Sequence, residues 1–280
     1  MATRFFAEFQ VFPKAKNLKE VFAVETNEKN WQQIAKKNKI PVKSFRKNFL
    51  KQQKYNQDFF NFGKKIARFF KFLPGISGLA ICNSVALQTS KKNSDIDFFI
   101  FCQNGKIWTA RFFAVLFLQI FGWRRNKKKI TKKICLSFFV VENFLDFKKI
   151  SIKPKDPYLA FWILSLKPVF GKKILEKFWK KNINFVQKNL GFMPEIEEIL
   201  QINCFEKKEK TFITKKFLEF IFFWLEKILK FFCYKRANKK RKLLKNSEGI
   251  IISDKILKFH DKDIRRKISK NIFFKNLKQS

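Results

Sequence analysis

The sequence predicts an α+β or α/β fold in which a small sheet is flanked by helices and followed by a helical region. Three short apolar runs, each bounded by turn residues, are typical of buried strands. Segments with the helical period stand before, between and after these runs. The 280 residues are enough to bury a core in one large domain or two modest ones.

The first predicted element is a short helix over residues 26–41, "TNEKNWQQIAKKNKIP". A longer helix is expected over residues 45–72, because apolar residues recur there on one stripe. The first strand is "ISGLAIC", residues 76–82, which turn residues bound on both sides. Residues 83–94 then form a loop with at most a short helix.

The second strand is "DIDFFIF", residues 95–101, and the third begins at Ile134 in "ICLSFFVVENF". Residues 106–125 lie between them and are apolar around most of a helical circumference, which predicts a buried helix. The basic run "RRNKKKITKK" before the third strand is expected to be a solvated loop. From Tyr158 onward, through "YLAFWILSLKPVFG" to the amphipathic segment 212–234, the pattern is helical.

A shift to polar, proline-containing sequence near residues 148–157 predicts a boundary. It divides the chain into an N-terminal extension (1–44), a first domain (45–150) and a helical C-terminal region with a basic tail (151–280). No internal repeat is visible in the sequence.

The chain is strongly basic, with 62 Lys and Arg against 22 Asp and Glu and a formal net charge of +40. A/T-rich codons encode Lys, Asn and Phe, so compositional drift is one explanation and an anionic partner is the other. In either case the positive surface attracts polyanions in a salt-dependent way. Nucleotides, nucleic acid or anionic lipid are the favoured partners, and "KRANKKRK" at 235–242 either grips nucleic acid or is a solvated charge run.

The five cysteines include no C-x-x-C pair, and most stand in apolar runs. This usage predicts reduced, buried thiols in a cytoplasmic protein, without a disulfide frame or zinc site. The single histidine, His260, restricts histidine-based nucleophilic catalysis to its own surroundings. Charged residues interrupt the apolar stretch 217–232, so we expect no transmembrane segment. An amphipathic helix packed on a core is expected there, and contact with an anionic membrane surface is the alternative.

The second predicted strand carries two acidic residues, Asp95 and Asp97, in front of an apolar run. Side chains alternate across a strand, so both carboxylates would project to one face. Two carboxylates this close repel each other and need a cation beside them. Mg²⁺ takes oxygen ligands and is often held by one or two carboxylates together with substrate phosphates. The pair predicts a Mg²⁺ site, unless Asp95 caps a turn and Asp97 faces water.

The residues before the acidic pair extend this pattern. In "LAICNSVALQTSKKNSDIDFFIF" a strand leads to a small polar turn at Asn83-Ser84, then to a basic loop and the acidic strand. This order resembles the DNA polymerase β superfamily of nucleotidyltransferases. The longer stretch from "RFFKFLPGISG", together with "ICLSFFVVENF" and "DPYLAFWILSLKPVFG", looks like bacterial nucleotidyltransferase-domain proteins. The resemblance covers about residues 60–200 and, more weakly, the C-terminus.

The resemblance implies a nucleotidyltransferase-like domain with a small mixed sheet over residues 45–150. It implies Mg²⁺-dependent transfer of a nucleoside monophosphate from an NTP to a hydroxyl acceptor. Asp95 and Asp97 match the family's catalytic, metal-binding pair, and Ser84 matches the serine that holds the triphosphate. Ser94 is a further candidate nucleotide contact, unless it caps the start of the strand.

Two positions depart from the family's pattern. Asn83, a candidate nucleotide-binding residue, stands where the motif has Gly, and Asn is the next most tolerant residue for a positive φ. Active members also carry a third carboxylate, a general base, on a following strand. In "ICLSFFVV" the polar candidate is Ser137, which cannot serve as that base, and Glu142 lies at the far end. The alternative is therefore a degenerate protein on the same fold that binds nucleotide or RNA without transfer.

Overall fold

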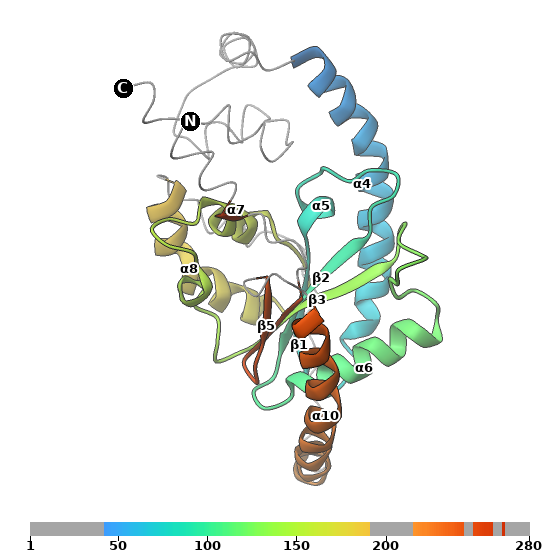
Figure 1. Cartoon of the computed structure of the whole chain (residues 1–280), viewed down its shortest axis with the longest axis vertical. Helices are drawn as coiled ribbons and strands as arrows, with labels where there is room; N and C mark the ends of the chain where they lie inside the picture. The colour runs from blue at the N-terminus through green and yellow to red at the C-terminus, as the bar shows by residue number, and fades with distance from the viewer. Residues whose placement is uncertain (1–41, 191–214, 244–248, 260–264, 267–280) are drawn as a thin grey trace.

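A computed structural model describes residues 42–190, 215–243, 249–259 and 265–266 (Figure 1). The helix predicted over residues 26–41 and the single His260 lie outside these ranges. The strands are β1 (Ile76–Cys82), β2 (Ile96–Cys102), β3 (Ile134–Val141), β4 (Lys167–Phe170), β5 (Ile250–Ile252) and β6 (Ile256–Phe259). The helices are α4 (Val42–Phe70), α5 (Asn83–Ala86), α6 (Ile107–Ile120), α7 (Pro157–Ser165), α8 (Lys172–Leu190) and α10 (Lys215–Leu243), with a 3₁₀ helix, η1 (Phe147–Ile150).

The fold is α+β, as the sequence predicts, and is built on one mixed six-stranded sheet. The strand order is β4-β1-β2-β3-β6-β5. β2 and β3 are parallel and are connected through α6, whereas the other neighbouring strands are antiparallel. β2 therefore lies inside the sheet, with β1 on one side and β3 on the other.

Alternation along β2 divides the core into two layers. Ile96, Phe98 and Ile100 point to the face that α4, α6 and α10 cover. Phe99 and Phe101 point to the opposite face, which α7 and α8 cover. Helices on both faces keep water from the sheet, so β2 is buried along its whole length and is apolar except at Asp97. This division confirms the alternation expected from the sequence.

Three of the six strands follow residue 150, where the sequence predicts helices, so the sheet is not confined to residues 45–150. The helix expected through "YLAFWILSLKPVFG" ends at Ser165, and β4 follows it. Pro168 explains the change, because it lacks an N–H and forces the residue before it out of the helical region. β4 then pairs with β1, and β6 pairs with β3.

Asp156 fixes the start of α7 from within the core. Its carboxylate accepts hydrogen bonds from the backbone N–H groups of Leu159 and Ile152, at 3.0 and 3.1 Å. Arg265 Nη1 lies 3.1 Å from the same carboxylate, and both side chains are almost fully buried. The cap orders the start of α7, and the buried ion pair joins Arg265 to it.

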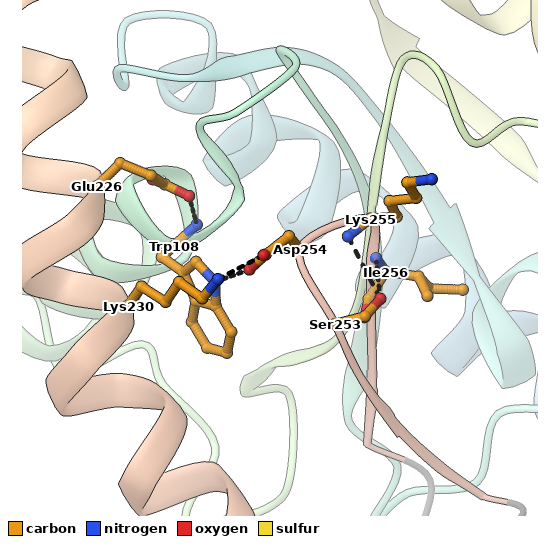
Figure 2. A network of polar contacts seen from close by, with 7 residues as sticks. All are labelled: Trp108, Glu226, Lys230, Ser253, Asp254, Lys255 and Ile256. Carbon is orange, nitrogen blue, oxygen red and sulfur yellow. Dashed lines mark hydrogen bonds and ion pairs between the residues drawn. The ribbon is translucent and has the colours of Figure 1, made fainter.

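α10 is attached to the rest of the fold by polar contacts that Figure 2 shows. The Glu226 carboxylate accepts hydrogen bonds from the backbone N–H groups of Trp108 and Thr109, at 2.9 and 2.7 Å, and so caps the first turn of α6. Asp254, in the turn between β5 and β6, accepts from the Trp108 indole at 3.0 Å and pairs with Lys230. The segment around residues 217–232 is therefore a helix packed on the core. Among the described helices, none is both long enough and apolar enough to pass through a membrane.

Candidate metal and nucleotide site

The predicted acidic pair lies at the end of the sheet where β2 begins. Asp95 directly precedes β2, and Asp97 is its second residue. The pairing of β2 with β3 sets Asp97 opposite Cys135. One carboxylate oxygen from each aspartate and the sulfur of Cys135 all lie within 4.8 Å of one another. The structure therefore brings the two predicted acids together and adds a thiol that the sequence interpretation did not include.

Asp97 is a buried carboxyl group, with only 9% of its surface exposed. Burial raises its pKa from 3.8 to about 6, and the neighbouring charge of Asp95 adds to the rise. Hydrogen bonds from Asn83, Cys135 and Ser137 act in the opposite direction, and the Ser137 hydroxyl donates to Oδ1 at 3.3 Å. The ionised form of Asp97 is therefore costly here unless a cation joins it.

Arg125 supplies the cation that lies beside Asp95. Its Nη1 is 3.1 Å from Asp95 Oδ2, and the same nitrogen is 3.7 Å from the sulfur of Cys135. The contact with Asp95 is close but poorly directed, so this buried oxygen accepts no hydrogen bond. Arg125 belongs to the basic segment that the sequence interpretation placed in solvent, and its side chain is 44% exposed.

Cys135 stands opposite Asp97 on β3, two residues before Ser137, the position that the sequence analysis considered for the third carboxylate. Burial raises the pKa of its thiol well above 9, and the charges of Asp97 and Asp95 raise it further. The thiol is therefore neutral near pH 7 and offers no general base. The sequence held one signal for Cys135: strand alternation from Ile134 sets Cys135 on the same face as Ser137.

A register shift explains why the face of β3 is hard to read from its sequence. From Asp97 to Phe99 the chain advances two residues in β2, while β3 advances three, from Cys135 to Phe138. Such a bulge changes which face the following side chains occupy. Glu142 follows the other end of β3, where its N–H donates to the carbonyl of the last residue of β2. It lies roughly 20 Å along the strand from Cys135 and is not brought to the acidic pair.

Asn83 has a positive φ of 55°, a conformation that favours glycine and that Asn tolerates better than most residues. Its side chain is held in place, because Oδ1 accepts a hydrogen bond of 2.8 Å from the Trp162 indole. The same amide also bonds to Asp97. Asn83 therefore connects α7 to the acidic pair.

The two predicted serine contacts differ in their surroundings. Ser84 is partly exposed in the first turn of α5, and its carbonyl accepts a hydrogen bond of 2.8 Å from the Thr89 N–H. The Ser94 hydroxyl instead accepts from the Lys91 N–H at 2.9 Å and closes the turn before β2. Ser94 therefore contributes to this turn, and its expected nucleotide contact stays a prediction.

The donors at this site fit Mg²⁺ through the carboxylates alone. Asp95 offers a buried oxygen without a hydrogen bond, and Asp97 offers a carboxyl group that burial makes costly to ionise. Mg²⁺ prefers oxygen ligands, whereas a thiol suits softer metals. Asp95 and Asp97 would therefore hold the ion, and Cys135 would line the site without ligating it.

Comparison with known proteins adds no relative: no protein-family model, curated protein or solved structure matches this chain.

Proposed function

We propose that the chain binds a nucleoside triphosphate together with Mg²⁺ at Asp95 and Asp97, on a fold of the nucleotidyltransferase type. One observation supports this most directly: two carboxylates meet on one face at the start of β2, beside a left-handed turn at Asn83. The pKa of Asp97, raised to about 6 by burial and by Asp95, adds support, because a cation shared by both carboxylates would lower the cost of ionising Asp97.

Each residue has a distinct role in this proposal. Asp95 and Asp97 hold the ion, and the resemblance assigns the triphosphate to Ser84 and the turn backbone. Asn83 orients Asp97 through its amide, which Trp162 fixes. Bound Mg²⁺ would neutralise the charge of the phosphate oxygens.

Binding without transfer is the function that the described residues favour. Transfer to a hydroxyl acceptor needs a base that receives the acceptor's proton. In the described part of the chain, the group of Asp, Glu, His and Cys side chains at this site is completed by Cys135, a neutral thiol. Transfer of a nucleoside monophosphate, which the complete Asp95–Asp97 pair supports, is the second candidate.

A titration tests nucleotide binding, and a labelling experiment then separates binding alone from transfer of a nucleoside monophosphate. The purified chain is titrated with each of the four labelled NTPs, in Mg²⁺ or in EDTA. We expect binding that weakens at least about tenfold without Mg²⁺, because both carboxylates and the phosphates then repel each other. A lack of Mg²⁺-dependent binding for every NTP would contradict the proposal. Label transferred from an α-labelled NTP to an acceptor in a cell extract would establish the second candidate.

Replacing Arg125 by Gln is expected to strengthen metal binding, because the guanidinium competes with the ion for Asp95. Arg125 is nearly half exposed, so the gain should be modest, roughly two- to fivefold. The measurement is a titration with Mg²⁺, or with Mn²⁺ as a spectroscopic probe, in the absence of nucleotide. The control is Arg68→Gln, an exposed arginine on α4. Equal metal affinity in Arg125→Gln and in the unmodified chain would remove Arg125 from the site.

A further inference from the structure

α10 carries an exposed apolar surface that the nucleotide site does not use. We call it the outer face of α10, and it consists of Phe223, Trp224, Ile228, Phe231 and Phe232. Each of these side chains is between 50% and 64% exposed in the described part of the structure. Figure 1 shows α10 on the outside of the fold, crossing α6, with one end extending past the other described elements. A contiguous exposed apolar surface of this kind marks an interaction site.

The contacts of the opposite side prevent α10 from turning this face inward. Leu229 is buried in the core, and Glu226 is bonded to the first turn of α6 (Figure 2). Lys230 pairs with Asp254 on the β5–β6 turn. These contacts fix the rotation of the helix about its axis, so the aromatic residues remain directed outward.

The charges on α10 indicate the chemistry of the partner. Among the described side chains of the helix, Glu226 is the only acid, and it faces α6. The cations instead accompany the rings: Lys227 Nζ lies 4.3 Å from the Phe223 ring centre, and Lys235 Nζ lies 4.0 Å from that of Phe231. Exposed basic residues continue to the end of the helix, at Arg236, Lys239, Arg241 and Lys242. The outer face is therefore aromatic and cationic, and its described side chains include no acid.

We propose that the outer face of α10 docks on the surface of an anionic lipid bilayer, with the helix lying along the membrane plane. The aromatic and aliphatic side chains enter the boundary between headgroups and acyl chains. Lys227 and Lys235 hold their ammonium groups over the Phe223 and Phe231 rings in the free chain and direct them to the lipid phosphates at the membrane surface. The contact is to the surface, since no described helix can span a membrane. It is independent of the nucleotide site.

Other occupants fit this face less well. A second copy of the chain would bring the same lysines together, and like charges oppose that contact. A nucleic-acid strand would use the rings for base stacking, but Ile228 in their midst cannot stack on a base. A bilayer takes up aromatic and aliphatic side chains at the boundary of its acyl chains, and its anionic headgroups attract cations. The outer face of α10 has both kinds of side chain.

The test is flotation of the full chain with vesicles of phosphatidylcholine alone or mixed with phosphatidylserine. We expect binding to the anionic vesicles, which salt weakens. Phe231→Ser should reduce it roughly fivefold or more, because a large apolar side chain no longer enters the membrane. The matched control is Phe72→Ser, which removes an exposed phenylalanine outside α10.

A second variant tests the charges. Binding to anionic vesicles should fall about tenfold or more in the double variant Lys227→Glu and Lys235→Glu. The matched control is the double variant Lys180→Glu and Lys181→Glu, which makes the same charge change on α8.

Four outcomes would overturn the proposal. The first is a chain that does not float with anionic vesicles at low salt. The second is equal binding by the test variants and their controls. The third is self-association of the chain in solution that Phe231→Ser abolishes, because the face is then an interface between copies. The fourth is binding of an RNA oligonucleotide that Phe231→Ser weakens while vesicle binding is unchanged. Thermal unfolding of each variant verifies that the fold is retained.

Discussion

Replacing Asp97 by Asn is expected to abolish Mg²⁺-dependent nucleotide binding and, at the same time, to make the protein more stable near neutral pH. The loss of binding should be about a hundredfold or more, because an amide supplies no charge to the ion. The gain in stability arises because burial and Asp95 raise the pKa of Asp97 from 3.8 to about 6. That rise corresponds to a cost of about 3 kcal/mol in the ionised state. Asn avoids this cost but loses part of the hydrogen bonding, so we expect a net gain of about 1–3 kcal/mol.

The pH dependence of stability has a definite sign. An acid whose pKa is higher in the folded state binds its proton more tightly when folded, so folding is favoured as the pH falls. The cost of Asp97 is therefore fully present above about pH 6 and disappears as the pH falls toward about 4. Without Mg²⁺, the unmodified chain should gain stability relative to Asp97→Asn between about pH 7.5 and pH 5.

Urea unfolding at the two pH values and an NTP titration with Mg²⁺ measure both effects. Asp58→Asn is the matched control, because Asp58 is exposed and pairs with Lys132 outside the acidic cluster. Nucleotide binding by Asp97→Asn that equals that of the unmodified chain would show that the metal ligands are misassigned. If the unmodified chain and Asp97→Asn differ in stability by the same amount at both pH values, Asp97 does not titrate as described.

Replacing Phe99 by Ala is expected to destabilise the fold by about 3–5 kcal/mol, the largest single effect on stability predicted for this chain. Phe99 is fully buried, and its ring centre lies 4.6 Å from that of Phe101, 4.9 Å from Phe138 and 5.2 Å from Trp162. Phe147 and Phe178 also contact it, so the substitution removes dispersion contacts with five rings and leaves a cavity between the sheet and α7. Nucleotide binding should also weaken, because Trp162 holds Asn83 beside Asp97.

Denaturant unfolding of Phe99→Ala, with Phe72→Ala as control, measures this cost. Phe72 is 70% exposed, and its replacement should change the free energy of unfolding by less than about 1 kcal/mol. A loss below about 2 kcal/mol for Phe99→Ala would mean that the surrounding rings collapse into the cavity.

The central strands could be predicted from the sequence because their signal is local. "ISGLAIC" is β1 from its first residue to its last, and the strand predicted from residue 95 begins at Ile96. β4, β5 and β6 have only four, three and four residues, so none is long enough to show a period. Their pairing partners lie far away in the chain, and tertiary pairing decides their structure.

The acidic pair was predictable for the same reason, since strand alternation alone sets Asp95 and Asp97 on one face. Cys135 was missed, because alternation gives only its face, and the register of β3 against β2 is what sets it opposite Asp97. Arg125 was missed too, because in so basic a segment the sequence does not reveal which cation meets an acid. The nucleotide contacts expected at Asn83 and Ser84 stay predictions.

The placement of β6 beside β3 has a consequence for synthesis of the chain on the ribosome. β3 ends at Val141 and β6 begins at Ile256, about 115 residues later. At ordinary elongation rates, about 6–20 s pass before the partner strand emerges. During that interval the nascent chain presents an apolar strand with one unpaired edge, which is a template for association between chains. Correct maturation thus depends on keeping nascent chains apart until the last strands have been translated.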